Sequence, residues 1–182
     1  MSEFESLVDE HYGALFRFAL SLAKDRETAA DLVQQTFCIW AQKGDQLRDR
    51  SKAKTWLFTT LHREFLSHAR RSRKYAPGEV SENLAEESDD GGEDPDRQID
   101  GQRALELLGE LDETFRAPIT LFYLQQHSYK EIAEILDITM GTVMSRISRA
   151  KDMLRKKMTQ GPSSAPKNIL QLEPGKLRSY HG

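Results

Sequence analysis

The sequence predicts an all-α protein in which two small helical domains are joined by a flexible acidic linker. Apolar residues recur at three- and four-residue steps in both halves of the chain, which is the period of an amphipathic helix. We find no stretch with the alternating pattern of a β-strand. A segment almost free of apolar residues separates the two halves. A chain of 182 residues with 38% hydrophobic and 30% charged side chains suits two small cores with much exposed surface.

The first half, residues 1–75, shows the pattern of three helices. Apolar residues from Phe4 to Leu22 predict the first, and the run Lys24-Asp25-Arg26 ends it. Asp25 or Thr28 is suited to cap the second helix. Its apolar face includes Phe37 and Trp40, which we expect in the core together with Cys38.

A polar loop and a basic helix complete this half. Residues 43–52 are polar and loop-like, and a third helix then runs to the basic cluster at residues 70–74. Trp56, near the start of this helix, is either a stacking surface for a nucleic acid base or a core residue. We favour the core.

Residues 76–98 have the composition of a linker. Proline and glycine interrupt them and apolar residues are almost absent, so they cannot bury enough surface to fold. Fully extended, they would span roughly 75 Å. The flanking halves therefore need not touch. Residues 76–100 carry ten carboxylates and one basic side chain, whereas residues 1–75 have a net charge of +3.

The second half, residues 99–160, predicts four further helices. Residues 104–111 form an amphipathic pattern, and residues 114–125 form another with Pro118 in its first turns, where proline is tolerated. The remaining residues, 161–182, are predicted to be a mostly disordered C-terminal extension, with a short ordered contact expected at residues 169–172.

The segment SYKEIAEILDITMGTVMSRISRAK, residues 128–151, predicts a helix-turn-helix. Ser128 and Glu131 have capping-box spacing, and Thr139 is placed to cap a last helix that runs to about Met158. Arginine can bond guanine edges or phosphates, so its basic second helix suits DNA. A plain helical hairpin with a solvated basic face is the less favoured interpretation.

Other classes of function find little support. The single cysteine excludes an internal disulfide, and the five histidines have no metal-ligand spacing, so we expect no metal and no cofactor. There is no glycine-rich phosphate loop and no nucleophile elbow, so we do not expect an enzyme. The acidic start and the lack of a long apolar stretch favour a cytoplasmic protein without a membrane span.

Three stretches together resemble the extracytoplasmic-function (ECF) sigma factors of the sigma-70 class. DLVQQTFCIW at residues 31–40 and KTWLFTTLHREFLSHARR at residues 54–71 are similar to the family's second region. The helix-turn-helix, continued through Leu154, is similar to its fourth region. The resemblance implies a transcription initiation factor of the stress-response type, which directs core RNA polymerase to specific promoters. Residues 1–75 would be region 2 and residues 99–160 region 4.

The resemblance also implies roles for positions in the first half. One face of the 31–40 helix would dock on core polymerase, through Asp31, Gln34 and Gln35. The loop at residues 47–52 would hold a base flipped out of the melted minus-ten element, and the next helix would hold the melted strand. The residues implied in minus-ten binding are Leu47, Arg48, Arg50, Lys52, Lys54, Arg63, Arg70 and Arg71.

In the second half, the resemblance implies binding of the minus-thirty-five duplex. The implied residues are Thr142, Met144, Ser145, Arg146 and Arg149. Met144 departs from the family pattern, which has a basic residue there, and a methionine can contact a thymine methyl group instead. The acidic linker would enter the basic channels of the polymerase, and an anti-sigma factor is an expected partner.

Two alternatives stay open from the sequence. A sigma-like mimic would bind an anti-sigma factor and never a promoter, but it should lack the basic residues on both DNA-binding helices. A plain helix-turn-helix regulator would leave residues 31–71 unexplained.

Overall fold

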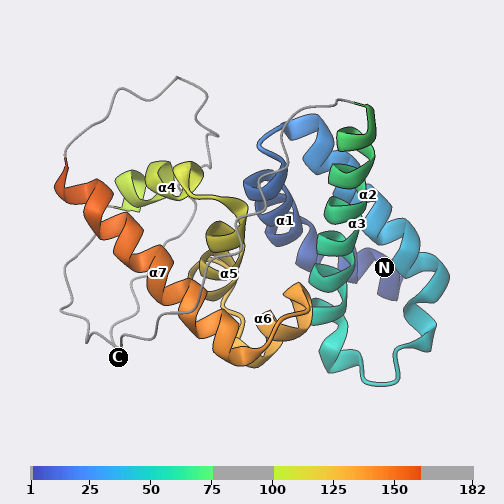
Figure 1. Ribbon diagram of the computed structural model, residues 1–182. Helices are drawn as coiled ribbons and strands as arrows, with labels where there is room; N and C mark the ends of the chain where they lie inside the picture. The colour runs from blue at the N-terminus through green and yellow to red at the C-terminus, as the bar shows by residue number, and fades with distance from the viewer. Residues whose placement is uncertain (1, 76–100, 161–182) are drawn as a thin grey trace.

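The protein is described here by a computed structural model covering residues 2–75 and 101–160, and all its regular structure in these ranges is helical (Figure 1). The all-α prediction is therefore confirmed. The predicted linker at residues 76–98 and the extension at residues 161–182 lie outside the described residues. The helices are α1 Glu3–Ala23, α2 Arg26–Lys43, α3 Ala53–Tyr75, α4 Gly101–Glu110, α5 Glu113–Tyr123, α6 Tyr129–Leu136 and α7 Met140–Thr159, with two short 3-10 turns, η1 Gly44–Gln46 and η2 Arg50–Lys52.

Local signals in the sequence fix where α1 and α2 begin and end. Ser2 and Glu5 form a capping box at the start of α1. Lys24 ends α1 in the left-handed conformation, with φ 58°. Asp25 caps α2 by accepting hydrogen bonds from the backbone N–H groups of Glu27 and Thr28. Of the two predicted caps, Asp25 is the one used, and the Thr28 hydroxyl donates to it.

Aromatic side chains hold α1, α2 and α3 together as the first unit, residues 2–75. The Phe18 and Phe58 rings are fully buried with centroids 5.5 Å apart. Trp40 is buried, and its ring meets that of half-buried Trp56 edge-on at 5.0 Å. Burying each such side chain stabilises the fold by roughly 1.5–3 kcal/mol. The expectation that Phe37, Trp40 and Trp56 pack in the core is confirmed.

The second unit, residues 101–160, contains the predicted helix-turn-helix, α6 and α7. The Ser128–Glu131 capping box is present, and Asp137 makes the tight turn with φ 54°. The Thr139 side chain caps α7 by accepting from the backbone N–H of Thr142. Helices α4, α5 and α7 share a small separate core, formed by Leu107, Leu111, Ile119, Ala150 and Leu154.

The two units pack directly against each other. Helix α6 lies along α3, and α5 contacts α1, so that α5 and α6 stand between the first unit and α7 (Figure 1). Buried residues of both units belong to one continuous apolar cluster, which includes Leu57 and Leu61 on one side and Leu121 and Ile135 on the other. The sequence left the two halves free to stay apart, whereas in this structure they share a core.

Candidate nucleic-acid interface

The residues expected to dock on polymerase lie together on one exposed face of α2. Asp31, Gln34 and Gln35 are all exposed, and their spacing of three and four residues places them on the same side of the helix. The opposite side carries Val33, Phe37 and other buried residues that pack on α1 and α3. Helix α2 therefore presents a polar, uncovered face of the first unit.

Cys38 also belongs to this face, which corrects the sequence-based expectation that it is a buried filler. It is exposed, and it lies four residues after Gln34 and three after Gln35. The residues beside it in sequence, Phe37 and Ile39, are buried and half-buried, but successive helical residues point in different directions. The apolar character of the neighbours was thus a poor guide to the position of the thiol.

The loop between α2 and α3 is shaped by its own side chains. The carboxylate of Asp49 accepts hydrogen bonds from the Ser51 hydroxyl at 2.6 Å and the Ser51 backbone N–H at 3.0 Å. These bonds stabilise the charged form, so they lower the pKa of Asp49. At the start of the loop, a Cβ on Gly44 would lie 2.7 Å from the Trp40 ring, so only glycine fits against that ring without a shift.

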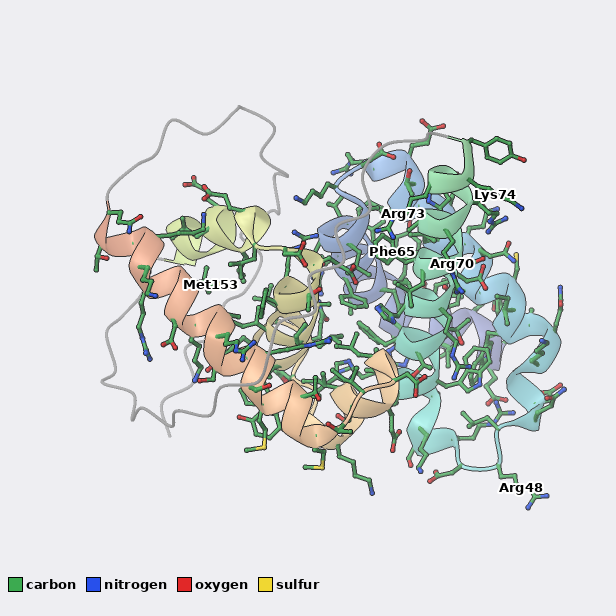
Figure 2. The ribbon with its side chains drawn as sticks, in the orientation of Figure 1. Arg48, Phe65, Arg70, Arg73, Lys74 and Met153 are labelled. Atoms are coloured by element: carbon green, nitrogen blue, oxygen red, sulfur yellow. The ribbon has the colours of Figure 1, made fainter. Side chains whose placement is uncertain are left out.

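Two of the expected minus-ten residues brace this loop. Arg50 lies 5.8 Å above the Trp40 ring and forms ion pairs of 3.5 Å with both Glu3 and Asp45. Leu47 is half-buried against the apolar core. Arg48, Arg50 and Lys52 are all exposed, and Arg48 extends outward from the tip of the loop (Figure 2). The sequence alone did not separate the supporting residues from the projecting ones.

A basic stripe runs along the outer side of α3. Arg63, Arg70 and Lys74 are exposed and recur at spacings of seven and four residues, so they lie on one side of the helix, opposite the buried Leu57 and Leu61. Figure 2 shows Arg70 and Lys74 near the C-terminal end of α3. Arg71 is exposed too, but it lies on an adjoining side. The distance from Lys52 to Arg70 along the helix axis is roughly 27 Å. This is a long track of positive charge, suited to a strand of nucleic acid.

Lys54 lies apart from this stripe. Its ammonium group donates a hydrogen bond of 2.8 Å to the backbone carbonyl of Gln125, in the second unit. Lys54 is half-buried. The structure thus places one expected minus-ten residue in the contact between the units.

The expected minus-thirty-five residues differ in exposure. Met144 is 51% exposed and Ser145 is also exposed, although the Ser145 hydroxyl donates to the carbonyl of Thr142 in the preceding turn. Thr142 is half-buried, and its hydroxyl lies 2.8 Å from that of Thr139 within the cap. Met140, which the sequence reading did not single out, is 48% exposed one turn before Met144.

Arg146 and Arg149 are half-buried. Arg146 lines a small pocket between the units, together with His62, Leu66, Glu113, Thr114, Ala117 and Leu136. From the sequence, Thr142, Ser145, Arg146 and Arg149 were expected on the exposed faces of α7. The structure instead turns Arg146 toward the first unit, while Met144 and Ser145 face solvent.

No group of three or more potential metal-ligating side chains occurs among residues 2–75 and 101–160. None of their helices is long and apolar enough to cross a bilayer.

Comparison with known proteins assigns both units. Residues 7–75 match the family described as Sigma-70 region 2, and residues 101–154 match Sigma-70, region 4. The ECF RNA polymerase sigma factor SigM of Bacillus subtilis is 30% identical over 85% of this chain and 96% of its own length. The ECF sigma factor SigL of Mycobacterium tuberculosis is 31% identical over 82% of this chain and 85% of its own.

Solved structures agree with these matches. The sigma factor RpoE of Bartonella quintana, in complex with the anti-sigma factor NepR, has a TM-score of 0.69 and 30% identity, covering 89% of this chain and all of that one. CnrH, in complex with the cytosolic domain of CnrY, shares the fold with a TM-score of 0.59 at 22% identity. Both sigma-70 regions are present in order, in a chain of nearly the relatives' length, and the protein is therefore a member of the ECF sigma factors of the sigma-70 family.

Proposed function

We propose that this sigma factor divides promoter recognition between its two units, with residues 1–75 acting as region 2 and residues 99–160 as region 4. The α2 face formed by Asp31, Gln34 and Gln35 docks on core polymerase. The α2–α3 loop and α3 hold the melted minus-ten strand, and α7 reads the minus-thirty-five duplex. The chain carries out no chemistry of its own and acts where the polymerase is, in the cytoplasm.

The basic stripe on α3 is the observation that carries this proposal. Arg63 and Arg70 project from the side of the helix opposite the core, directly after the loop that carries exposed Arg48 and Lys52. A melted strand needs positive charge along its backbone. Because Arg50 and Leu47 also support the loop, we assign the first contacts with the strand to exposed Arg48 and Lys52.

Helix α7, the second helix of the helix-turn-helix, has exposed side chains suited to apolar contacts with the minus-thirty-five element. Met140 and Met144 form an exposed apolar pair one turn apart, next to exposed Ser145. Methyl and thioether groups favour contact with thymine methyls over hydrogen bonds to guanine. We therefore propose a thymine-containing step under Met144.

An anti-sigma factor is the proposed inhibitory partner. RpoE of Bartonella quintana, which shares 30% identity with this chain, is bound by the anti-sigma factor NepR in its solved structure. By analogy, an anti-sigma factor would cover surfaces of both units of this chain until a signal releases it.

Run-off transcription with purified core polymerase on a library of promoter fragments tests the division of roles. Wild-type chain should yield discrete transcripts. The double variant Arg63→Ala/Arg70→Ala should still bind core but should open the promoter poorly. The double variant loses two contacts to single-stranded phosphates. The logarithm of promoter affinity should therefore depend less steeply on the logarithm of salt concentration, and the magnitude of this slope should decrease by about 1.4.

The matched control is Arg17→Ala, which removes an exposed arginine from α1 instead of α3. It should transcribe like wild type. Equal activity of the double variant and this control would refute the role of the α3 stripe, and a chain that never binds core would refute the wider proposal.

A further inference from the structure

A row of apolar side chains follows the outer side of α1. Its four members recur at four-residue spacing and therefore share one side of the helix; they are Phe4, Val8, Tyr12 and Phe16. Phe4 is 40% exposed and Tyr12 is 46% exposed, whereas Val8 and Phe16 are half-buried. The core of the first unit thus leaves much of this row uncovered.

The apolar row runs along α2. The Phe4 ring meets the ring of buried Phe37 edge-on, with centroids 6.3 Å apart. At the other end of the row, the Arg26 guanidinium lies over the Phe16 ring, 5.5 Å from its centroid. Gln34 lies three residues before Phe37 and is its neighbour on the surface of α2. The row therefore runs beside the α2 face that we propose as the polymerase-docking surface.

An open groove lies at the start of this row. The residues that line this α1 groove are Phe4, Glu5, Val8 and Asp9. Two of them are apolar and two carry carboxylates. The Glu5 carboxylate accepts a hydrogen bond from the Ser2 backbone N–H in the capping box, and Asp9 is exposed. The α1 groove thus combines apolar surface with two negative charges.

The charge around the α1 groove is of one sign. Residues 2–16 carry four carboxylates and no lysine or arginine. A negative surface of this kind attracts basic groups and disfavours acidic ones. The partner that fits the groove is a short peptide with an apolar side chain between basic side chains.

The residues that follow α7 contain such a peptide. Residues 161–182 carry three basic side chains and one acidic side chain. Two of the bases, Lys176 and Arg178, flank Leu177. An apolar side chain between two cations matches the α1 groove in both apolar character and charge.

The chain after α7 is long enough to bring this segment to α1. Leu177 is 17 residues beyond Gln160, and 17 residues reach roughly 56 Å when extended. A compact body of the size described has a radius of gyration of roughly 14 Å, hence a diameter of roughly 36 Å. A covalent tether of this length gives a local concentration on the order of a millimolar, so a weak contact suffices for docking.

We propose that the α1 groove binds the segment Lys176-Leu177-Arg178 of the same chain. In this complex the Leu177 side chain covers the apolar lining of the groove, and the two basic side chains pair with its two carboxylates. The groove is thus a docking surface for the chain's own C-terminal segment.

The docked segment lies beside the α2 face and competes with core polymerase for that edge of the first unit. This consequence rests on the proposed docking role of α2, whereas the docking of the segment does not. If docked chains outnumber free ones by about three to one, the competition weakens core binding by about fourfold.

Distances between spin labels in the full-length chain test the docking without polymerase. In a Cys38→Ser background, Ser6→Cys and Ser179→Cys place one label beside the α1 groove and the other beside the docked segment. Ser6 is exposed and does not line the groove. The chain should show a short, narrow distance. High salt should broaden the distance, because it screens the ion pairs.

Leu177→Asp should remove the short distance, because it brings a third carboxylate to the α1 groove. The matched control is Leu170→Asp, the same substitution earlier in residues 161–182, which should keep the short distance. A broad distribution with Leu177 unchanged would overturn the docking. Equal effects of the two substitutions would overturn the assignment to the segment at Leu177.

The α1 side of the contact is tested by a change of charge. Asp9→Lys should broaden the distance, because the basic segment then meets a positive charge in the groove. Its control is Glu134→Lys, which makes the same change of charge at an exposed position of α6 and should leave the distance unchanged. A short distance that survives Asp9→Lys would place the segment elsewhere.

An excess of unlabelled chain separates docking within one chain from docking onto a second copy. Docking within the chain leaves the short distance unchanged. If the segment of a second copy occupies the groove, unlabelled segments displace labelled ones and the short distance disappears. That result would overturn the intramolecular site.

Core polymerase binding tests the competition. Leu177→Asp should bind core about fourfold more tightly than wild-type chain, and Leu170→Asp should bind like wild type. Equal affinity of the three chains would refute the competition. Failure of all three to bind core would count against the proposed function alone, since the label distances decide the docking independently.

Discussion

At the scale of single residues, His127 is a buried polar side chain, with 2% of its surface exposed. Burial lowers its pKa to about 4, and the nearby Lys54 ammonium acts in the same direction. Glu131, whose carboxylate lies 3.5 Å from Nδ1, opposes this shift but does not overcome it. While the two units are packed together, the imidazole is therefore neutral throughout the physiological range.

The packing of the two units should weaken as the pH falls below 6.5. Above that pH His127 is neutral whether the units are packed or apart, so it contributes no pH dependence. Below that pH, His127 binds a proton when the two units are apart, but when they are packed together it binds one only near pH 4. At pH 5 the balance should shift toward separated units by about 2 kcal/mol, or about thirtyfold. A pH titration of the distance between spin labels attached at exposed positions 9 of α1 and 153 of α7, in a Cys38→Ser background, measures this shift.

Attribution to His127 needs a variant, because burial also lowers the pKa of His11, which Lys54 influences too. His127→Phe keeps an aromatic ring against Phe58 and removes the titrating group. Its distance distribution should stay unchanged between pH 7 and pH 5. A variant that opens over the same range as wild type would assign the pH dependence to another group.

At the scale of elements, helix boundaries were predictable because short-range chemistry sets them. Asp25, Ser128 and Thr139 cap their helices as their spacing indicates, and the turn at Asp137 lies where the apolar pattern shifts. The buried position of Ile135 was not predictable in the same way. Helix α6 is covered by α3 as well as by α7. The contact with α3 could not be predicted from the local pattern, because α3 lies far away in the sequence.

The expectation that Cys38 is buried was wrong for a related reason. The exposed thiol allows the proposed docking role of α2 to be tested. The thiol is the only one in the chain and lies beside Gln34 and Gln35 on the proposed docking face. Modification of native protein with a bulky maleimide should abolish binding to core polymerase, because the adduct covers that face. Association can be measured by gel filtration or fluorescence anisotropy.

The Cys38→Ser chain, treated with the same reagent, is the control and should bind core normally. Pre-formed complex with core should in turn protect Cys38 from the reagent. Full core binding by the modified wild-type chain would place the docking surface elsewhere on the first unit.

For the molecule as a whole, the fold class, the order of helices and the family could be predicted from the sequence. The packing of the two units against each other could not. The exposure of candidate site residues was predictable where they project from a helix, as at Asp31, Arg63 and Ser145. It was not predictable for Lys54 and Arg146, because their surroundings depend on how two distant parts of the chain pack. Packing between the units depends on small differences in buried apolar area and in the hydrogen bonding of polar groups. The spacing of apolar residues in the sequence carries no information on either.

The shared core predicts that the whole molecule unfolds as one cooperative unit. Both tryptophans, Trp40 and Trp56, lie in the first unit, so their fluorescence reports that unit alone, while far-ultraviolet circular dichroism reports the helices of both. In wild-type chain at pH 7 the two thermal transitions should coincide, as a two-state process requires. In His127→Lys they should separate, because each unit then unfolds at its own temperature. Separate transitions in the wild type would mean that the common core adds too little free energy to couple the units.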